Sequence, residues 1–328
     1  MPSLNQVRQS NNALKASSPG KVAVFVGGTG GVGEEAAKSL ARTLERPTIF
    51  LLGRNDASAA RIIEEMKLAN PGGSYKFFKC DTSLLKNVDS ACKAIQKQTS
   101  MVDLLIMSAG SVCVPREDTA EGLEKNLVER YYSRMRFIHN LLPLLKVSES
   151  PRVISILLAG FEIELEDGKL EIPAPRSSVH DVKHAATMTS LAIEHLAVEH
   201  PSVSFLHVWP GVVKTKLLDK GWGWLGAGIL WLLLWPFSIT REQSGEYNTY
   251  LSTSSAYPPL ELKESQDTSG KAESYVKSEL GGGSYILDYK GDNSANSKLM
   301  AGYRAKGYAH KTWTHTLDIF QAALNSSC

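Results

Sequence analysis

The chain has 328 residues, 43% of them hydrophobic and 21% charged, which is the composition of an ordinary globular protein with a sizeable core. A formal net charge of +2, with acids and bases mixed along the chain, gives no basic patch, so we expect no nucleic-acid partner. The four cysteines lack CxxC and Cys/His ligand spacing; we expect reduced intracellular thiols, no disulfide framework and no metal site.

The first twenty residues are polar and lack the apolar run of a signal peptide. We therefore expect a disordered tail over residues 1–20 and a cytoplasmic protein. The remainder, 21–328, is expected to form one domain, because its pattern of elements is continuous.

Apolar runs and segments with helical spacing alternate along this domain. Strands are expected in "KVAVFV", "PTIFLLGRN", "YKFFKCD", "VDLLIMSAG", "RVISILLAG" and "VSFLHVWPG". Helices are expected after the first strand and over 58–68, 84–98, 122–145 and 182–199. Strands that are apolar on both faces and alternate with helices indicate a parallel sheet covered on both sides. The predicted fold class is therefore α/β, a Rossmann-type doubly wound sheet.

A glycine cluster, "GGTGGVG", follows the first expected strand and opens the first helix. It places Gly27, Gly31 and Gly33 where a tight turn must let a pyrophosphate approach the backbone and the free N–H groups of the helix. The cluster predicts a dinucleotide site.

Arg54 stands at the end of the second expected strand, in "LLGRN". An acid there would bind a ribose 2′-hydroxyl, whereas an arginine favours a 2′-phosphate. The sequence therefore predicts NADP(H) rather than NAD(H), with a solvated surface charge as the alternative.

Two later stretches interrupt the alternation. Residues 221–239 carry no charge and hold four of the six tryptophans; we expect a lid over an apolar substrate pocket at about 217–240. The length is also near the lower limit of a bilayer-spanning helix, so shallow membrane association through 221–239 and a true span remain alternatives. The second stretch, at about 260–274, is polar and aperiodic and is expected to be a surface insertion.

Four motifs, "GGTGGVG", "CDTS", "LLIMSAG" and "PGVVKT", resemble in order and spacing those of the short-chain dehydrogenase/reductase superfamily. Over residues 21–254 the resemblance implies a nicotinamide cofactor and hydride transfer between an alcohol and a ketone. The cofactor contacts that it implies are Gly27, Gly28, Thr29, Gly31, Val32, Gly33, Arg54, Asp81, Ala109, Gly110, Pro210 and Gly211. "MSAG" lacks both asparagines of the family's "NNAG", which puts the hydrogen bonding at that strand end in question.

The C-terminal part resembles a subset of fungal members of the same superfamily. "GGGSYILDYKGD" and "KTWTHTLDIFQAAL" correspond to an extra strand and helix, and many of that subset belong to secondary-metabolite pathways. Family members often pair through the long helices after the fourth and fifth strands, so a homodimer is the expectation by analogy.

The family's catalytic residues are absent. The serine position falls at Leu157 or Leu158, with Ser155 too early, and the asparagine position falls near Arg130. No tyrosine occurs between Tyr132 and Tyr247, so no shift of the alignment restores the tyrosine that should precede the lysine.

Three residues are candidates for the missing proton transfer. Lys183 is either the family's lysine or a surface lysine, since aligning the helix by "LAIE" puts Asp181 at that place. His184 and Tyr132 suit general acid/base chemistry, with a structural histidine and a packing aromatic as the alternatives. We hypothesise that His184, aided by Lys183 or Tyr132, supplies the proton.

The sequence thus predicts an NADP(H)-dependent oxidoreductase that interconverts an alcohol and a ketone on a bulky apolar substrate, such as a terpenoid or polyketide intermediate. The alternative is a non-redox isomerase or cyclase, or a binding protein, that keeps the fold without hydride transfer.

Overall fold

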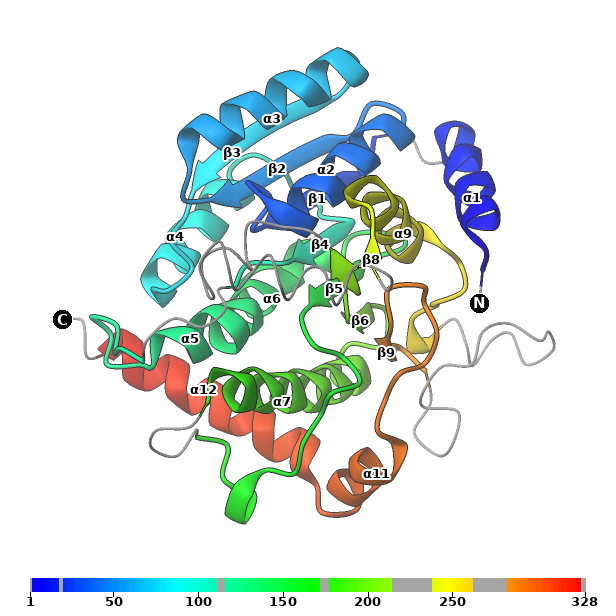
Figure 1. The fold of residues 1–328 in the computed structure, drawn as a ribbon. Helices are drawn as coiled ribbons and strands as arrows, with labels where there is room; N and C mark the ends of the chain where they lie inside the picture. The colour runs from blue at the N-terminus through cyan, green and yellow to red at the C-terminus, as the bar shows by residue number, and fades with distance from the viewer. Residues whose placement is uncertain are drawn as a thin grey trace, which may run out of the picture.

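Seven parallel strands form one sheet in the computed structural model, which describes residues 2–17, 20–110, 116–171, 177–213, 238–261 and 282–325 (Figure 1). The strand order is β3-β2-β1-β4-β5-β6-β9, which confirms the predicted doubly wound α/β fold. The strands of this sheet are β1 (Val22–Val26), β2 (Thr48–Gly53), β3 (Ser74–Lys79), β4 (Leu104–Met107), β5 (Arg152–Ile156), β6 (Ser204–Val208) and β9 (Ser284–Leu287). A separate short pair joins β7 (Val212–Val213) to β8 (Ser238–Ile239).

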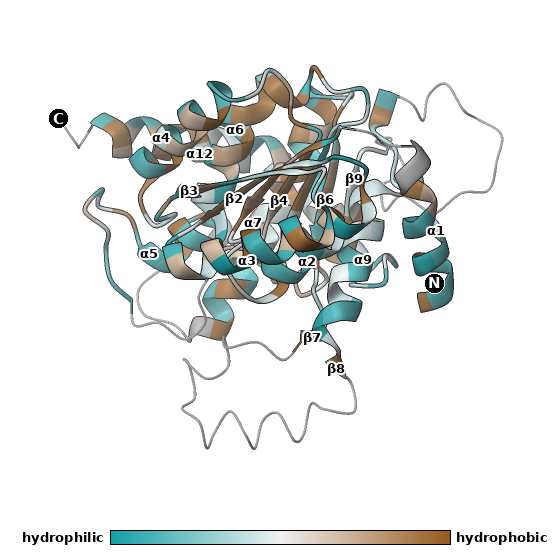
Figure 2. Ribbon diagram, turned by 90° about the horizontal axis from the view of Figure 1, so that it is seen from above, coloured by the Kyte–Doolittle hydropathy of each residue, from teal (hydrophilic) through white to brown (hydrophobic). Residues whose placement is uncertain are grey.

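Helices cover both faces of the sheet (Figure 2). One layer contains α2 (Gly31–Thr43), α3 (Asp56–Ala69) and α9 (Arg241–Thr253). The other contains α4 (Leu85–Gln96), α6 (Ser133–Leu145), α7 (Ser178–Glu199) and α12 (Tyr308–Asn325). Shorter segments are α5 (Lys125–Leu127), the π-helical turn η1 (Val128–Tyr132), the 3-10 turn η2 (Glu166–Gly168) and α11 (Ser297–Ala305).

Strand β1 shows why the strands are apolar throughout. It pairs in parallel with β2 on one side and β4 on the other, so that Val24 lies beside Phe50 and Leu105. Successive side chains point to opposite faces: Val24 packs beneath α4 and α6, and Phe25 packs against α2. Both faces are buried, and the strand therefore reads as one continuous apolar run.

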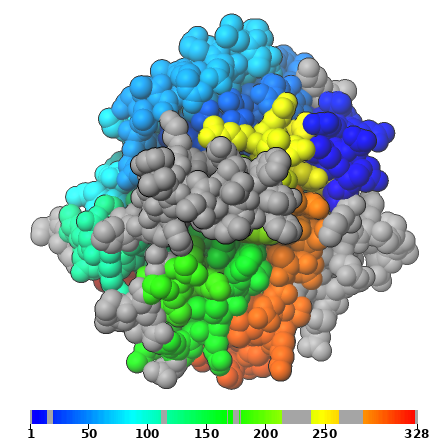
Figure 3. All heavy atoms as spheres, viewed as in Figure 1, coloured from blue at the N-terminus to red at the C-terminus, as the bar shows by residue number. Residues whose placement is uncertain are grey.

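The N-terminal segment corrects one prediction. Residues 1–20 were expected to be disordered, but α1 (Leu4–Ser17) is a helix that packs on α9 (Figure 3). Ser3 and Gln6 form reciprocal backbone to side-chain hydrogen bonds of 2.7 and 3.3 Å at its start, as in a capping box. Val7 is fully buried and Asn11 donates to the carbonyl of Glu246, 2.9 Å away. The helix is stable because it is held by packing, not by its own propensity.

The C-terminal segment agrees with the predicted extra strand and helix. β9 extends the sheet beyond β6, and α12 packs against α7. Most of the predicted lid at 217–240 and of the predicted insertion at 260–274 lies outside the described residues. Among the helices that the structure describes, none is long and apolar enough to cross a bilayer.

Candidate active site

The glycine-rich turn lies between β1 and α2, directly against the end of β4. Gly27 has a φ of 87°, and a Cβ atom there would lie 2.5 Å from the backbone nitrogen of Ala109. A Cβ atom on Gly33 would lie 2.2 Å from Ser108 Oγ. Glycine is required at both positions, because a larger residue would push the turn away from β4.

The first turn of α2 is open at its N-terminus. Its N-cap residue is Gly30, which has no side chain to accept from the first amides of the helix. Apart from Gly30 and its two chain neighbours, no described heavy atom lies within 4 Å of the place where a Cβ of Gly30 would be. Free N–H groups and the positive end of the helix dipole therefore face the carboxyl ends of the strands. This cradle fits the pyrophosphate of a dinucleotide.

Ser108 makes hydrogen bonds at the strand end where the superfamily's "NNAG" has its asparagines. Its amide donates to the carbonyl of Val26 at 2.8 Å, and its Oγ makes a longer hydrogen bond of 3.4 Å to the carbonyl of Gly27. A small hydroxyl therefore joins β4 to the glycine turn, and the absent Cβ of Gly33 leaves room for it.

Arg54 and Asp81 follow β2 and β3 at the same edge of the sheet. The Arg54 side chain is 57% exposed, and its Nη1 lies 3.6 Å from Oε1 of Glu129 in η1. Asp81 Oδ1 accepts from the amide and the hydroxyl of Ser83, at 3.1 and 2.8 Å, which holds the carboxylate in one orientation. Both residues stand where the sequence placed them, and their contacts with a cofactor stay predictions.

Arg134 on α6 is a residue of this edge that sequence reasoning missed. It is fully buried, and its guanidinium donates to the carbonyls of Ile156 (2.8 Å) and Ala109 (2.6 Å) and to Ser155 Oγ (2.8 Å). It also donates to the carbonyl of Met107 at 3.2 Å. Burial, with the neighbouring charge of Arg130, lowers the pKa of Arg134 to about 9. One cation thus holds the ends of β4 and β5 together beside the glycine turn.

The comparisons with known proteins agree with this geometry. A family model described as short chain dehydrogenase matches residues 21–157. The chain is 57% identical over 334 residues to the oxidoreductase andH of Emericella variicolor, covering 100% of this chain and 99% of that protein. It is 31% identical over 349 residues to the short-chain dehydrogenase/reductase SAT2 of Stachybotrys chartarum, covering 97% and 96%. The chain belongs to the short-chain dehydrogenase/reductase superfamily.

Solved structures show the same fold at low sequence identity. An NADP active-site complex of RhlG from Pseudomonas aeruginosa superimposes with a TM-score of 0.58 at 18% identity, covering 74% of this chain and 92% of RhlG. L-sorbose reductase from Gluconobacter frateurii, in complex with NADPH and L-sorbose, gives a TM-score of 0.56 at 17% identity, covering 73% and 92%.

Leucines stand where the superfamily's serine is predicted. Leu157 and Leu158 follow the end of β5 and are half-buried. Ser155 lies within the strand, fully buried, where its hydroxyl accepts from Arg134. Arg130, near which the superfamily's asparagine is predicted to fall, lies in η1.

His184 is buried on α7 and contacts the loop that precedes this helix. Its Nε2 lies 2.9 Å from the carbonyl oxygen of Leu170, and because a carbonyl only accepts, Nε2 must carry the proton. Burial lowers the pKa of His184, which favours this neutral form. This hydrogen bond is a structural reason for a histidine at position 184. The role of His184 as proton donor stays a prediction. The neighbouring Lys183 is half-buried, and its carbonyl accepts from Thr187 Oγ1 at 3.1 Å.

Tyr132 lies in the core between η1 and α12. Its hydroxyl is 2.9 Å from Nε2 of His315 on α12, and burial raises its pKa. Tyr131 makes the equivalent contact, 2.6 Å from Thr316 Oγ1. Tyr132 thus contacts the C-terminal helix, whereas His184 contacts the loop before α7. The catalytic role of Tyr132 stays a prediction that this contact does not favour.

The "PG" loop follows β6 at the same edge. Gly211 has a φ of 72°, and a Cβ atom there would lie 2.8 Å from the ring of Tyr289. Trp209, just before Pro210, contacts the rings of Phe161 and Tyr289 edge to face. The loop predicted to lie beside the nicotinamide is therefore bordered by aromatic side chains.

Proposed function

We propose that this protein is an NADP(H)-dependent oxidoreductase that interconverts an alcohol and a ketone on a bulky apolar substrate in secondary-metabolite biosynthesis. The observation that carries the proposal is the glycine turn, packed against β4 and followed by the uncapped α2, with Arg54 at the end of the next strand.

Different residues at the carboxyl ends of the strands would bind different parts of the dinucleotide. The amides at the start of α2 would hold the pyrophosphate, and the exposed guanidinium of Arg54 would pair with the 2′-phosphate. Gly211 and Pro210 would border the nicotinamide. When bound, the cofactor supplies or accepts the hydride.

Two further observations support the choice of cofactor and substrate. The structures of RhlG and of L-sorbose reductase, which share this fold, are described as complexes with NADP and NADPH. The aromatic side chains beside Gly211 suit an apolar ligand, since such pockets are lined by aromatic and aliphatic groups.

Binding and hydride transfer are tested separately. Fluorescence titration with NADPH and NADH should show tighter binding of NADPH. NADPH that carries deuterium at the hydride position should then transfer the label to a product when the protein is supplied with an extract of apolar metabolites. Tighter binding of NADH would contradict the assignment of the cofactor.

A second candidate is a non-redox isomerase or cyclase, or a binding protein, on the same fold. One observation favours it: His184 and Tyr132, the candidates for proton transfer, and Ser155 are each hydrogen-bonded within the protein. A product that forms only when the protein is present but carries no deuterium would support this candidate, because a shaped cavity can accelerate a reaction by positioning alone.

A further inference from the structure

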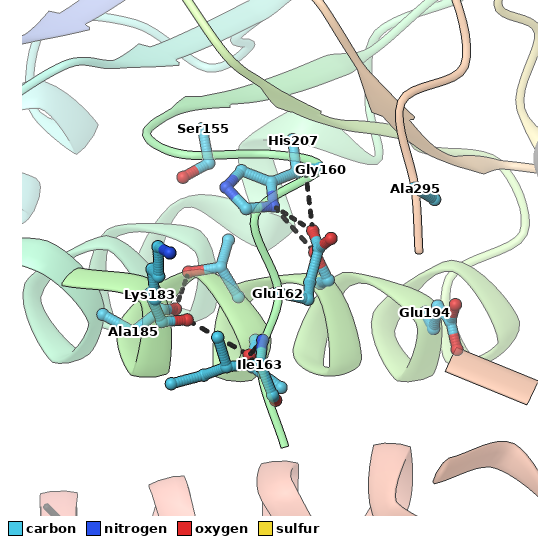
Figure 4. Close-up of polar contacts among 12 residues, drawn as sticks. Ser155, Gly160, Glu162, Ile163, Lys183, Ala185, Glu194, His207 and Ala295 are labelled. Carbon is cyan, nitrogen blue, oxygen red and sulfur yellow. Dashed lines mark hydrogen bonds and ion pairs between the residues drawn. The ribbon is translucent and has the colours of Figure 1, made fainter. Parts of the chain in front are cut away.

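The loop after β5 is hydrogen-bonded to α7 and lies against the segment that follows β9 (Figure 4). Gly160 has a φ of 87°, and a Cβ atom there would lie 2.6 Å from the carbonyl oxygen of Ser294. The amide of Ile163 donates to Thr187 Oγ1 at 2.9 Å, and this hydroxyl also contacts the carbonyl of Ile163 at 3.1 Å. The backbone on both sides of residue 161 is therefore fixed.

Glu162 anchors this loop from the inside. Its side chain is fully buried, and its Oε1 accepts from the amide of Gly160 at 3.1 Å and from Ser190 Oγ at 2.8 Å. Ser190 Oγ also lies 2.8 Å from Nδ1 of His207 on β6. A hydroxyl has one proton, so if Ser190 donates to the carboxylate, Nδ1 of His207 must donate to Ser190. Burial and the charge of Arg134 lower the pKa of His207 to about 3, which agrees with a neutral imidazole.

Phe161 is exposed although its loop is rigid. Its side chain is 40% exposed, whereas its neighbour Glu162 is buried. The ring contacts Trp209 edge to face, with centroids 5.4 Å apart and an interplanar angle of 65°. From Trp209 the contacts continue to Tyr289, at 6.2 Å. Phe161 and Trp209 together offer an apolar aromatic surface, the kind of lining that ligand pockets have.

Phe161 and Trp209 lie at the same edge of the sheet as the proposed cofactor site. Trp209 directly precedes Pro210 and Gly211, and Phe161 lies three residues beyond Leu158, one of the two residues at the predicted serine position. Both rings therefore stand at the carboxyl ends of neighbouring strands, β5 and β6, where ligands bind in open α/β sheets.

We propose that Phe161 and Trp209 form the aromatic face that contacts the substrate, that they favour a larger apolar compound over a small one because two adjacent rings offer more contact area, and that Glu162 positions Phe161. The inference rests on the proposed function for one point, that the substrate lies beside the dinucleotide.

Binding of two probe ketones tests the aromatic face without requiring turnover. Decalone has two fused saturated rings and cyclohexanone has one. Calorimetric titration of each, with and without NADP⁺, measures the preference of the wild-type protein and of three variants: Phe161→Leu, Trp209→Leu and the control Phe78→Leu. Phe78 is a half-buried ring on β3 that contacts Phe50 and lies near the opposite edge of the sheet.

We expect the wild-type protein to bind decalone more tightly than cyclohexanone. Phe161→Leu and Trp209→Leu should lower that preference about fivefold, the size expected for losing one aromatic contact, and Phe78→Leu should leave it unchanged. A wild-type protein without the preference, or variants that keep it, would overturn the aromatic face. A protein that fails to bind NADP⁺ but still shows the effect would disprove the proposed cofactor and leave the aromatic face standing.

Two variants of Glu162 test whether this residue positions Phe161. Glu162→Gln keeps an oxygen that can accept from Gly160 and Ser190, and it should retain the preference for decalone. Glu162→Ala loses that acceptor and should behave as Phe161→Leu does. If Glu162→Gln loses the preference as fully as Phe161→Leu, or Glu162→Ala is folded and keeps it, Glu162 does not position Phe161.

Discussion

Single residues at the carboxyl ends of the strands show which parts of the site a sequence can reveal. The glycine turn was predictable because its sequence pattern is local, a glycine cluster directly after a strand, although the atoms that exclude a Cβ at Gly27 and Gly33 belong mostly to Ser108 and Ala109 after β4. The contacts of Arg134 were not predictable, since its partners come from the ends of β4 and β5. The one available signal was an arginine at core spacing between Tyr131 and Ile138, both of which are buried.

Arg54 should determine the preference between the two nicotinamide dinucleotides. Its guanidinium is exposed and has a weak pair in Glu129, 3.6 Å away, so it can turn toward a 2′-phosphate. Arg54→Gln should weaken NADPH binding about tenfold and change NADH binding less than about twofold, because only NADPH carries the phosphate. Arg61→Gln, at another half-exposed arginine, is the control. Equal losses for both dinucleotides would refute this role.

His207 should make the stability of the fold depend on pH. Its pKa is lowered to about 3 in the folded protein from about 6.5 in the unfolded chain, so the unfolded chain binds the additional proton between these values. Stability is therefore complete above about pH 6.5 and is lost as the pH falls. Between about pH 7 and about pH 5 this loss should be about 2 kcal/mol.

His207→Asn should remove that part of the pH dependence, because the amide can still contact Ser190 but does not titrate. Urea denaturation at several pH values measures it, with the exposed His310→Asn as the control. An unchanged slope between the two pH values in His207→Asn would show that another group is responsible.

His184 and Tyr132 can be tested for proton transfer by variants that preserve their contacts. The amide of His184→Gln can still donate to the carbonyl of Leu170, and Tyr132→Phe removes only the hydroxyl that faces His315. If His184, aided by Lys183 or Tyr132, supplies the proton, turnover should fall about a hundredfold or more in His184→Gln, the usual effect of losing a general acid. Turnover within about threefold of wild type for both variants would exclude these two residues as proton donors.

At the scale of elements, the alternation of strands and helices was predictable because each strand is buried on both faces. The N-terminal helix was not, although "SLNQ" contains the Ser and Gln of a capping box. A polar helix such as α1 becomes stable only through its contact with α9, which no local pattern reports. The start of the helix after β4 was also not predicted correctly. The sequence predicted a helix over 122–145, but the observed helix begins at Lys125 with α5 and continues through the π-turn η1.

Helix α12 should contribute to stability as a part of the core. Phe320 is 2% exposed, and the guanidinium of Arg136 lies 5.0 Å from the centre of its ring. Phe320→Ala should lower the free energy of unfolding by about 3 kcal/mol or more, since it leaves a cavity. Leu317→Ala on the same helix, where the side chain is 37% exposed, should cost less than about 1 kcal/mol and serves as the control in urea denaturation. Equal costs would mean that α12 is not packed as described.

At the scale of the whole molecule, the proposed site lies where a doubly wound sheet places its ligands. β1 lies between β2 and β4, so the connections leave it in opposite directions, and the glycine turn stands at that point. The crevice there is a consequence of strand order, which is why the site could be located from four short motifs. The proton donor could not be located from the sequence, because its identity depends on which side chains come into contact after folding.

Helix α12 covers the helices through which a homodimer was expected to form. Members of the superfamily are expected to pair through the helices after the fourth and fifth strands, here α6 and α7. In this chain, Tyr131 contacts Thr316, and both His139 and His195 contact Trp313, so α12 lies over both helices. A second copy cannot pack on faces that the same chain already covers.

We therefore expect a monomer of 35.8 kDa, in place of the homodimer expected by analogy. Light scattering coupled to size-exclusion chromatography, over a hundredfold range of protein concentration, measures the mass directly. A mass of twice this value at every concentration would contradict the expectation. Cross-links between copies would then show whether α12 itself forms the interface, because exposed positions on that helix, such as Gln321, would be joined to the partner.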